Sequence, residues 1–381
     1  MKPHRWDIFC SVVDNFGDIG VCWRLARRLA TGLAQDVRLW VDDLDSFRRL
    51  RPAVDGAQST QRIDGIEVRR WDSDFPDVAP ADIVVEGFGV RLPDAFLDAM
   101  AARRPPPVWI NLEYLSAEAW IETHHGLPSP HPRLPLTKHF FFPGFTAATG
   151  GVLIEAGLDA ARVALQAAPP AIAAFDHALG IKPRGGAACR VSLFCYENAA
   201  LPGLVAAWAA DADGVDCIVP EGPAQSQIAR IAGAPCTPGT ALDIGQLRVH
   251  AVPFLDPDRY DRLLWTCDLN FVRGEDSFVR AQLAARPLVW QAYPQEDGAH
   301  LVKADAFAAR AFAGLAGPAA PAVRALFDAW NRLLPACGDA WPAVRAGLPL
   351  LRAHAEAWQR RLASHGDLGT NLARFCEDRL E

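Results

Sequence analysis

Residues 14–20 read Asp14-Asn15-Phe16-Gly17-Asp18-Ile19-Gly20, between an apolar run at residues 8–13 and a helical pattern at residues 21–30. A strand, a glycine turn and a helix N-terminus in this order form the first βα unit of many ligand-binding α/β domains. The stretch lacks the full G-x-G-x-x-G spacing, and two aspartates would repel a phosphate. It therefore favours a cationic group or a proton over a phosphate as its ligand.

The bulk composition is that of a globular protein of two domains. The chain has 381 residues, of which 50% are hydrophobic and 22% are charged. Its formal net charge of -7 argues against a nonspecific nucleic-acid binder, which is normally basic. Nine cysteines without a C-x-x-C pair indicate buried, reduced thiols. No signal pattern or membrane-length apolar run is visible, so we expect a cytoplasmic protein with no membrane partner.

Strand and helix patterns alternate through the first half of the chain. Strands are predicted at residues 37–41, 66–71, 82–89 and 107–115, with a helix at 92–103. This alternation favours a parallel sheet covered by helices on both faces. The pattern breaks at residues 123–149, which are rich in Pro, His and Phe and are interpreted as a long loop. The sequence leaves open whether this loop contacts a protein substrate, lines a cleft or braces its domain.

A second α/β series follows residues 167–188, which contain Pro and Gly and are interpreted as an interdomain linker. Its strands are predicted at residues 190–196, 215–219, 247–254, 269–272 and 287–291. Its helices are predicted at residues 201–212, 225–232, 258–266 and 278–285, and the tail from residue 319 is mostly helical.

These patterns predict the domain organisation. We expect an N-terminal Rossmann-like domain at residues 1–166, joined by a C-terminal helix at 360–381, and a second Rossmann-like domain at 189–359. Two doubly wound domains facing a central cleft, with a helical tail, indicate a GT-B-type glycosyltransferase. Ligands of such sheets bind at the carboxyl ends of the strands.

One polar cluster, Arg273-Gly274-Glu275-Asp276-Ser277, lies between a predicted strand and a predicted helix. Asp276 or Ser277 is expected to cap that helix. Gly274 lets backbone N–H groups approach a diphosphate, and Arg273 adds a charged donor. Glu275 can accept hydrogen bonds from sugar or ribose hydroxyls. The alternative is a plain capped helix with an exposed salt bridge.

Aromatic residues end two strands of the second series. Phe194 and Tyr196 end the first of them and can stack on a nucleotide base. Phe254 ends another and can form a further wall of the same pocket. Core packing is the alternative for each of these rings.

Two patterns raise the question of a metal. Residues 72–74 and 256–258 both read D-x-D, which holds a divalent ion in GT-A transferases. His124, His125 and His131 also lie close together in the Pro-rich stretch. Both D-x-D pairs fall in loop-like segments, and GT-B enzymes generally use helix dipoles and basic groups, so we expect no metal and no cofactor.

Several motifs together resemble the bacterial elongation factor P arginine rhamnosyltransferase family (EarP). They are Asp-Asn-Phe-Gly-Asp-Ile-Gly at 14–20, Leu-Glu-Tyr-Leu-Ser at 112–116, Gly-Leu-Pro-Ser-Pro at 126–130, Phe-Phe-Phe-Pro-Gly-Phe at 140–145 and Arg-Gly-Glu-Asp-Ser at 273–277. The resemblance implies a GT-B fold and transfer of rhamnose from dTDP-β-L-rhamnose to one arginine of elongation factor P. It also implies inversion at the anomeric carbon.

The resemblance also implies roles for individual residues. Asp14, Asp18 and Glu275 match residues essential in that family, and Phe194 and Tyr196 match the aromatics that hold the thymine, whereas Phe254 lies in a looser part of the match. The expected donor-binding set also includes Asn15, Phe16, Gly17, Arg273, Gly274, Asp276 and Ser277.

Arginine chemistry explains the acidic stretch. The guanidinium stays protonated at neutral pH, so it is a poor nucleophile. One carboxylate can orient the guanidinium by paired hydrogen bonds while the other takes its proton. We assign Asp18 as the base and Asp14 as the orienting partner. The partners expected are elongation factor P and dTDP-rhamnose, with the protein a monomer. The alternatives are a GT-B transferase acting on a small molecule, or a non-catalytic nucleotide-sugar-binding protein.

Overall fold

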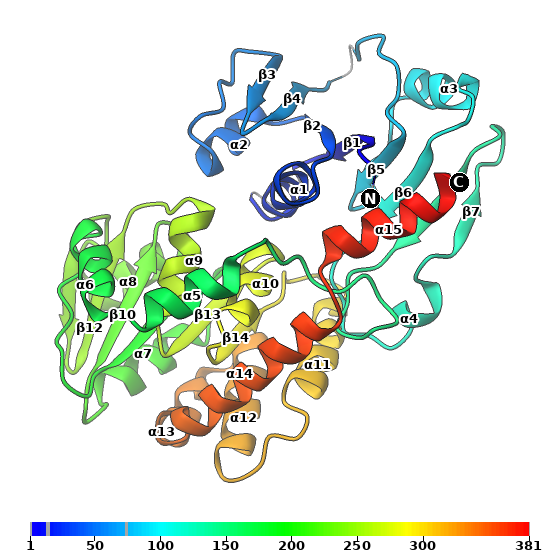
Figure 1. Ribbon diagram of the computed structural model, residues 1–381. Coiled ribbons are helices and arrows are strands. Elements are labelled where there is room, and N and C mark those ends of the chain that lie inside the picture. Colours follow the sequence, from blue (N-terminus) through cyan, green and yellow to red (C-terminus); the bar gives the residue numbers. More distant parts are fainter. Residues whose placement is uncertain (1, 13–15, 73–74, 381) are drawn as a thin grey trace. The chain divides into compact units, whose positions relative to one another are not determined.

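The computed structural model describes residues 2–12, 16–72 and 75–380 (Figure 1). The chain divides into two compact units, one comprising Met1–Ala156 with Leu362–Glu381 and the other comprising Gly157–Arg361. The stretch 167–188, expected as a linker, contains helix α6 (Pro169–Ala178), which packs with α5 (Leu158–Gln166) in unit 2. Pro169 and Pro170 stand at the first positions of α6, where proline favours a helix start instead of interrupting one.

Unit 1 contains an eight-stranded sheet in the order β3-β4-β2-β1-β5-β6-β8-β7. Its strands are β1 (Arg5–Cys10), β2 (Asp36–Val41), β3 (Thr60–Ile63), β4 (Ile66–Arg70), β5 (Ile83–Gly87), β6 (Val108–Leu112), β7 (Pro128–Pro130) and β8 (Thr137–Phe141). β1 pairs in parallel with β2 on one side and β5 on the other. The edge strands β3 and β7 are antiparallel to their neighbours. The strand order therefore reverses between β1 and β5.

The helices of unit 1 include one from the far end of the chain. They are α1 (Gly17–Arg27), continued by the π-helix η1 (Arg28–Gly32), α2 (Leu44–Leu50), α3 (Asp94–Ala102), α4 (Ile121–His124) and α15 (Leu368–Leu380). In Figure 1, α15 lies beside β6, which it contacts. Asp367, just before α15, forms an ion pair of 2.9 Å with Arg28 of η1. This pair and the backbone N–H of Lys2, which donates to Glu377, tie the end of the chain to unit 1.

Unit 2 contains a six-stranded sheet in the order β11-β12-β10-β9-β13-β14. Its strands are β9 (Cys189–Leu193), β10 (Val215–Pro220), β11 (Ala241–Ile244), β12 (Leu247–Val252), β13 (Leu269–Arg273) and β14 (Leu288–Gln291). All neighbours pair in parallel except β11, which forms an antiparallel hairpin with β12. Here the strand order reverses between β9 and β13.

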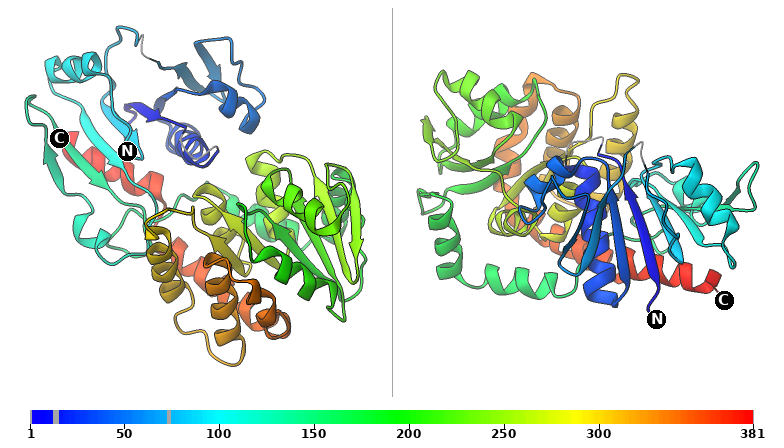
Figure 2. Two further views of the ribbon diagram at one scale, coloured as in Figure 1. Left: turned by 180° about the vertical axis from the view of Figure 1, so that it is seen from behind. Right: turned by 90° about the horizontal axis from the view of Figure 1, so that it is seen from above.

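Helices cover both faces of the unit 2 sheet (Figure 2). Those that follow successive strands are α7 (Leu201–Ala209), α8 (Pro223–Ala232), α9 (Pro257–Thr266), α10 (Asp276–Leu283) and α11 (Ala299–Ala311). The remaining elements are α12 (Ala319–Asn331), the short 3-10 helix η2 (Pro335–Ala340), α13 (Trp341–Ala346) and α14 (Leu348–Ser364). α7 packs with η2 and α13, whereas α9 packs with α5 and α10.

The predicted alternation of strands and helices is confirmed in both units, with most boundaries shifted by a few residues. The prediction of a long loop at residues 123–149 is wrong. This stretch contains the end of α4 and both β7 and β8, and β8 pairs in parallel with β6. Phe141 is buried there and packs edge-on against His125 and against Phe375 of α15. These contacts favour the bracing interpretation for this part of the stretch.

The cysteine prediction is also confirmed, because all nine cysteines are free and buried. Among the described residues, no helix has both the length and the apolar character needed to cross a membrane.

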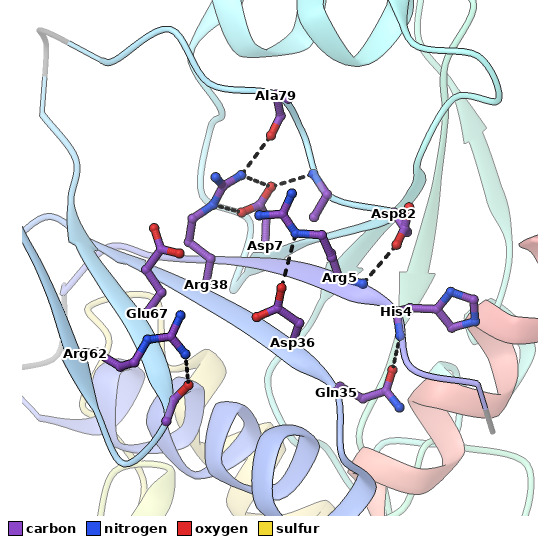
Figure 3. A network of polar contacts seen from close by, with 12 residues as sticks. His4, Arg5, Asp7, Gln35, Asp36, Arg38, Arg62, Glu67, Ala79 and Asp82 are labelled. Atoms are coloured by element: carbon purple, nitrogen blue, oxygen red, sulfur yellow. Dashed lines mark hydrogen bonds and ion pairs between the residues drawn. The ribbon is translucent and has the colours of Figure 1, made fainter.

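A buried ion pair between Asp7 and Arg38 links β1 to β2 in the unit 1 sheet (Figure 3). The Asp7 side chain on β1 is fully buried and accepts a hydrogen bond of 2.8 Å from Nη2 of Arg38 on β2. It also accepts one from the Trp40 indole at 2.9 Å and one from the Ala81 backbone N–H at 2.8 Å. Arg38 in turn donates to the Ala79 carbonyl. A buried charge is tolerated only when it is paired and hydrogen-bonded, as Asp7 is.

Replacing Asp7 with alanine should therefore strongly destabilise the protein. The change leaves the Arg38 guanidinium buried without its partner, so we expect a loss of about 3–5 kcal/mol in the free energy of unfolding. Asp36→Ala is the control, because it breaks the Arg5–Asp36 pair whose side chains are 54% and 56% exposed. That change should alter stability by at most about 1 kcal/mol. Urea titrations of both variants test this, and equal losses would contradict the role of burial.

Candidate active site

The strand order locates the candidate site in each unit. In open α/β sheets, ligands bind outside the carboxyl ends of the strands, where the strand order reverses. In unit 1 that point lies between β1 and β5, and the segment with Asp18 follows β1 directly. In unit 2 it lies between β9 and β13, which are followed by Tyr196 and Glu275. The residues singled out in the sequence thus follow the strands at which each sheet reverses.

Asp18 lies in the first turn of α1 and is only 1% exposed. Phe16 is the N-cap residue of this helix, and its carbonyl accepts from the Gly20 N–H at 2.9 Å. Gly17, expected in a turn, is the first residue of α1. A carboxylate in a first turn is stabilised by the helix dipole. Asp14 and Asn15, predicted to orient the acceptor and to bind the donor, lie outside the described residues.

Gly87, the last residue of β5, lets α1 pack closely against the sheet. A Cβ at this position would lie 2.8 Å from the Cys22 sulfur of α1 and 2.9 Å from the Phe9 carbonyl oxygen. The Cys22 side chain also forms a hydrogen bond with the Cys10 thiol. This hydrogen bond, together with burial, raises the pKa of the Cys10 thiol. The helix that carries Asp18 is therefore fixed against the ends of β1 and β5 by small side chains.

A residue that the sequence reasoning did not assign also reaches Asp18. The Tyr114 hydroxyl, beyond the end of β6, donates to Oδ1 of Asp18 at 3.1 Å. The Tyr114 ring stacks on Phe88, with ring centroids 4.4 Å apart and planes 13° apart. Tyr114 belongs to the Leu-Glu-Tyr-Leu-Ser motif quoted above, but no role was derived for it. The signal was its place near the end of the strand predicted at residues 107–115, and it lies two residues beyond the end of the observed β6.

An open hollow of about 580 Å³ lies on the same edge of the unit 1 sheet. Its lining residues follow β2, β4 and β5, and they are Asp42, Trp71, Asp72, Arg91, Leu92, Pro93 and Asp94. Asp42 accepts hydrogen bonds from the Ser11 hydroxyl at 2.5 Å and from the Val12 N–H at 2.9 Å. The hollow therefore adjoins Ser11 and Val12, the first residues after β1.

In unit 2, the Arg273 side chain lies against two of the predicted aromatic residues. Its guanidinium carbon is 4.5 Å from the centroid of the Phe194 ring and 4.3 Å from that of Tyr196. Tyr293, beyond the end of β14, packs edge-on against Tyr196 at 5.3 Å and is 56% exposed. The structure thus brings together Phe194, Tyr196 and Arg273, and it adds Tyr293, which the sequence reasoning missed.

The capping predicted for α10 is wrong. The helix begins at Asp276, its N-cap residue is Glu275, and the side chain of Glu275 makes no capping bond to the described first turn. Ser277 lies within the helix, and its hydroxyl donates to the Arg273 carbonyl and accepts from the Arg273 N–H at 3.2 Å. Gly274 has a φ of +60°, and its carbonyl accepts from the Trp290 indole at 3.0 Å. Ser277 therefore fixes the backbone of Arg273.

The remaining acidic and histidine candidates have structural partners. Asp256 caps α9 by accepting from the Arg259 N–H at 2.9 Å. His125 accepts from the Phe142 N–H and His131 from the Leu134 N–H, and burial lowers the pKa of His125. Over the described ranges, no three His, Cys, Asp or Glu side chains gather as a metal site. Asp74 lies outside those ranges.

Two further residues of unit 2 were singled out by the sequence or lie beside its candidates, and the place of Phe254 in the pocket stays a prediction. Phe254 is half-buried beyond β12, and its N–H donates to Glu221 at 3.4 Å. Cys195, between Phe194 and Tyr196, is fully buried, and this burial raises its pKa to about 12. A thiol in that state is not a nucleophile at neutral pH.

Comparisons with known proteins identify the family of the chain. The family model for elongation factor P (EF-P) rhamnosyltransferase EarP matches residues 6–377. A protein-arginine rhamnosyltransferase of Pseudomonas putida is 46% identical, over 98% of this chain and 99% of that protein. One from Neisseria meningitidis is 34% identical, over 79% of this chain and 77% of that protein.

Solved structures extend the similarity to the fold. The structure that describes EarP-mediated arginine glycosylation of translation elongation factor EF-P has a TM-score of 0.71 and 34% identity. That match covers 98% of this chain and 99% of the other. A glycosyltransferase of Rickettsia africae shares the fold alone, with a TM-score of 0.52 and 8% identity. The chain therefore belongs to the elongation factor P rhamnosyltransferase family and is a glycosyltransferase with the GT-B fold.

Proposed function

We propose that this chain transfers L-rhamnose from dTDP-β-L-rhamnose to an arginine of elongation factor P, with inversion at the anomeric carbon. The observation that carries the proposal is the buried Asp18 carboxylate, in the first turn of the helix that follows β1. The similarity to protein-arginine rhamnosyltransferases along nearly the whole chain supports the choice of donor and acceptor. We propose that the enzyme modifies this translation factor in the cytoplasm.

The acceptor chemistry requires a base close to the guanidinium. The guanidinium of arginine stays protonated far above neutral pH, so forming its neutral state at pH 7 costs roughly 9 kcal/mol. A carboxylate that accepts the proton as the new bond forms avoids this complete prior deprotonation. In unit 1, Asp18 is the described carboxylate assigned to this task, and Asp14 is proposed to orient the guanidinium. The adjoining hollow with Asp42 and Asp72 offers an acidic surface to the protein segment that carries the arginine.

The transfer is a single displacement. An arginine nitrogen attacks the anomeric carbon, the bond from that carbon to the diphosphate oxygen breaks, and dTDP leaves with the electron pair. The nitrogen loses one proton, which Asp18 accepts. A single displacement inverts the anomeric centre and needs no covalent enzyme nucleophile.

The donor is proposed to bind unit 2. Arg273 and the backbone N–H groups at the start of α10 supply positive charge for the diphosphate. Tyr196, Phe194 and Tyr293 supply aromatic surface for the thymine, with Phe254 as a further wall. Glu275 is proposed to accept hydrogen bonds from the sugar hydroxyls. Because Arg273 and the helix dipole stabilise the leaving group, the proposal includes no metal and no further cofactor.

The decisive experiment tests the reaction itself. The protein is incubated with dTDP-β-L-rhamnose and elongation factor P, and the acceptor is analysed by mass spectrometry. We expect a deoxyhexose mass increase on one arginine. A preparation that binds dTDP yet leaves the matched acceptor unmodified would contradict the proposal, whereas transfer to a small molecule alone would identify a different acceptor class.

The Asp18→Asn variant should lose turnover while it keeps the donor site. An amide cannot accept the proton, and removal of a general base typically slows a reaction by about 10²–10⁴-fold. The Kd for dTDP should stay within about twofold, because Asp18 lies in unit 1, whereas Arg273 and Tyr196, the residues proposed for the diphosphate and the thymine, lie in unit 2. Single-turnover rates and calorimetric titration measure both quantities. Asp45→Asn, the same change in the first turn of α2, is the control and should keep full activity.

Removing the Tyr196 ring should instead weaken donor binding. Base–aromatic stacking contributes about 1–3 kcal/mol, so Tyr196→Ala should raise the Kd for dTDP by roughly 5- to 150-fold. The same change removes one of the two rings that the Arg273 guanidinium packs against. Tyr196→Phe keeps the ring and is the matched control, with an affinity near that of the unmodified protein. If both variants bind dTDP equally well, the ring does not contact the donor.

A further inference from the structure

The Tyr114 hydroxyl contacts the carboxylate at the centre of the proposed reaction. It donates to Oδ1 of Asp18 at 3.1 Å, and Asp18 is 1% exposed. Tyr114 follows β6, which is separated from β1 by β5. The phenol therefore reaches Asp18 across the end of the intervening strand. A buried carboxylate needs hydrogen-bond donors, and a phenol at this distance is one.

The Tyr114 ring is held by a backbone segment with an uncommon conformation. Phe88, on which the ring stacks, has a φ of +60°, which a residue with a side chain rarely adopts. Such a conformation costs of order 1–3 kcal/mol and persists only when its surroundings enforce it. Here the Phe88 N–H donates to the Leu112 carbonyl at 2.7 Å, and the Gly89 N–H donates to the Asn111 side chain at 3.1 Å.

Both sides of this contact are thus anchored to the same strand. Leu112 and Asn111, which hold the segment with Phe88, are the last residues of β6. Tyr114 stands two residues after Leu112. The Asn111 side chain also donates to the carboxylate of Glu113, the residue between Leu112 and Tyr114, at 2.5 Å. The end of β6 therefore fixes the stacking partner and the tyrosine together. An aromatic ring held this way leaves its hydroxyl little freedom in direction.

We propose that Tyr114 is a positioning residue, whose hydroxyl orients the Asp18 carboxylate toward the arginine whose proton it accepts. The inference rests on the proposed function, because it needs Asp18 as the base. A carboxylate fixed by a hydrogen bond presents its lone pairs in one direction. Phe88 contributes by keeping the Tyr114 ring in place.

The test compares Tyr114→Phe with the unmodified protein. The variant keeps a ring against Phe88 and loses only the hydroxyl. A hydrogen bond to a charged group corresponds to a factor of about 10 to 150, so we expect kcat to fall by that factor. The Kd for dTDP should stay within about twofold, and Tm within about 3 °C. The KM for elongation factor P should stay within about threefold while kcat falls, a split that a purely structural role would not cause.

Two further variants keep the test decisive. Thr123→Val removes another hydroxyl from the connection between β6 and β8, one that donates to the Trp120 carbonyl, and should match the unmodified protein. Phe88→Leu keeps the Tyr114 hydroxyl but removes the stacking, so kcat should fall by about three- to tenfold. If Tyr114→Phe fails to fold, this variant decides the question, and an unchanged kcat overturns the proposal.

The outcomes separate this inference from the proposed function. If the unmodified protein does not modify elongation factor P, the proposed function fails first. If the unmodified protein is active and Tyr114→Phe keeps kcat within threefold, only the role of Tyr114 fails. A lower kcat accompanied by a loss of folding stability or of dTDP binding also overturns it, because the hydroxyl then does not act through the Asp18 carboxylate.

Discussion

The parallel pairing of β1 with β5, and of β9 with β13, is the constraint on which the candidate site of each unit depends. Crossover connections in parallel sheets are right-handed, so a chain that reverses its direction of winding must place its connections on opposite faces of the sheet. The two connections that diverge at such a point leave a crevice at the carboxyl edge. In this chain the segments that enter those crevices carry Asp18 in unit 1 and Arg273 with Tyr196 in unit 2.

β1 and the helix after it carry buried aspartates with different partners. Asp7, within β1, is neutralised by the Arg38 guanidinium and by donors from Trp40 and Ala81. Asp18, beyond β1, lies at a helix N-terminus and accepts from a phenol. A guanidinium contact offsets the charge of a carboxylate, whereas a phenol donates a hydrogen bond without adding a charge. The first arrangement suits the stability of the sheet, and the second involves the residue for which the acceptor role is proposed.

Sequence patterns predicted the regular elements well, because buried parallel strands such as β5 and β6 are continuous apolar runs. They failed at β7 and β8, where Pro128 and Pro130 hide a short edge strand. The cap of α10 was misplaced by one or two residues, which is the usual uncertainty of a helix end. Tyr114 and Tyr293 carried no role because their contacts with Asp18 and Tyr196 depend on strand order, which is not a local property of the sequence.

The proposed function assigns opposite charges to the candidate sites of the two units. The proposed donor is an anion through its diphosphate, and the proposed acceptor is a cation through its guanidinium. In this proposal Arg273 and the start of α10 attract the donor and repel the acceptor, while Asp18 and the hollow with Asp42 and Asp72 do the reverse. Specificity of this kind needs repulsion of the wrong ligand as well as attraction of the right one. The missing glycine fingerprint at residues 14–20 then has a physical reason, since a phosphate-binding loop there would attract the donor to the acceptor side.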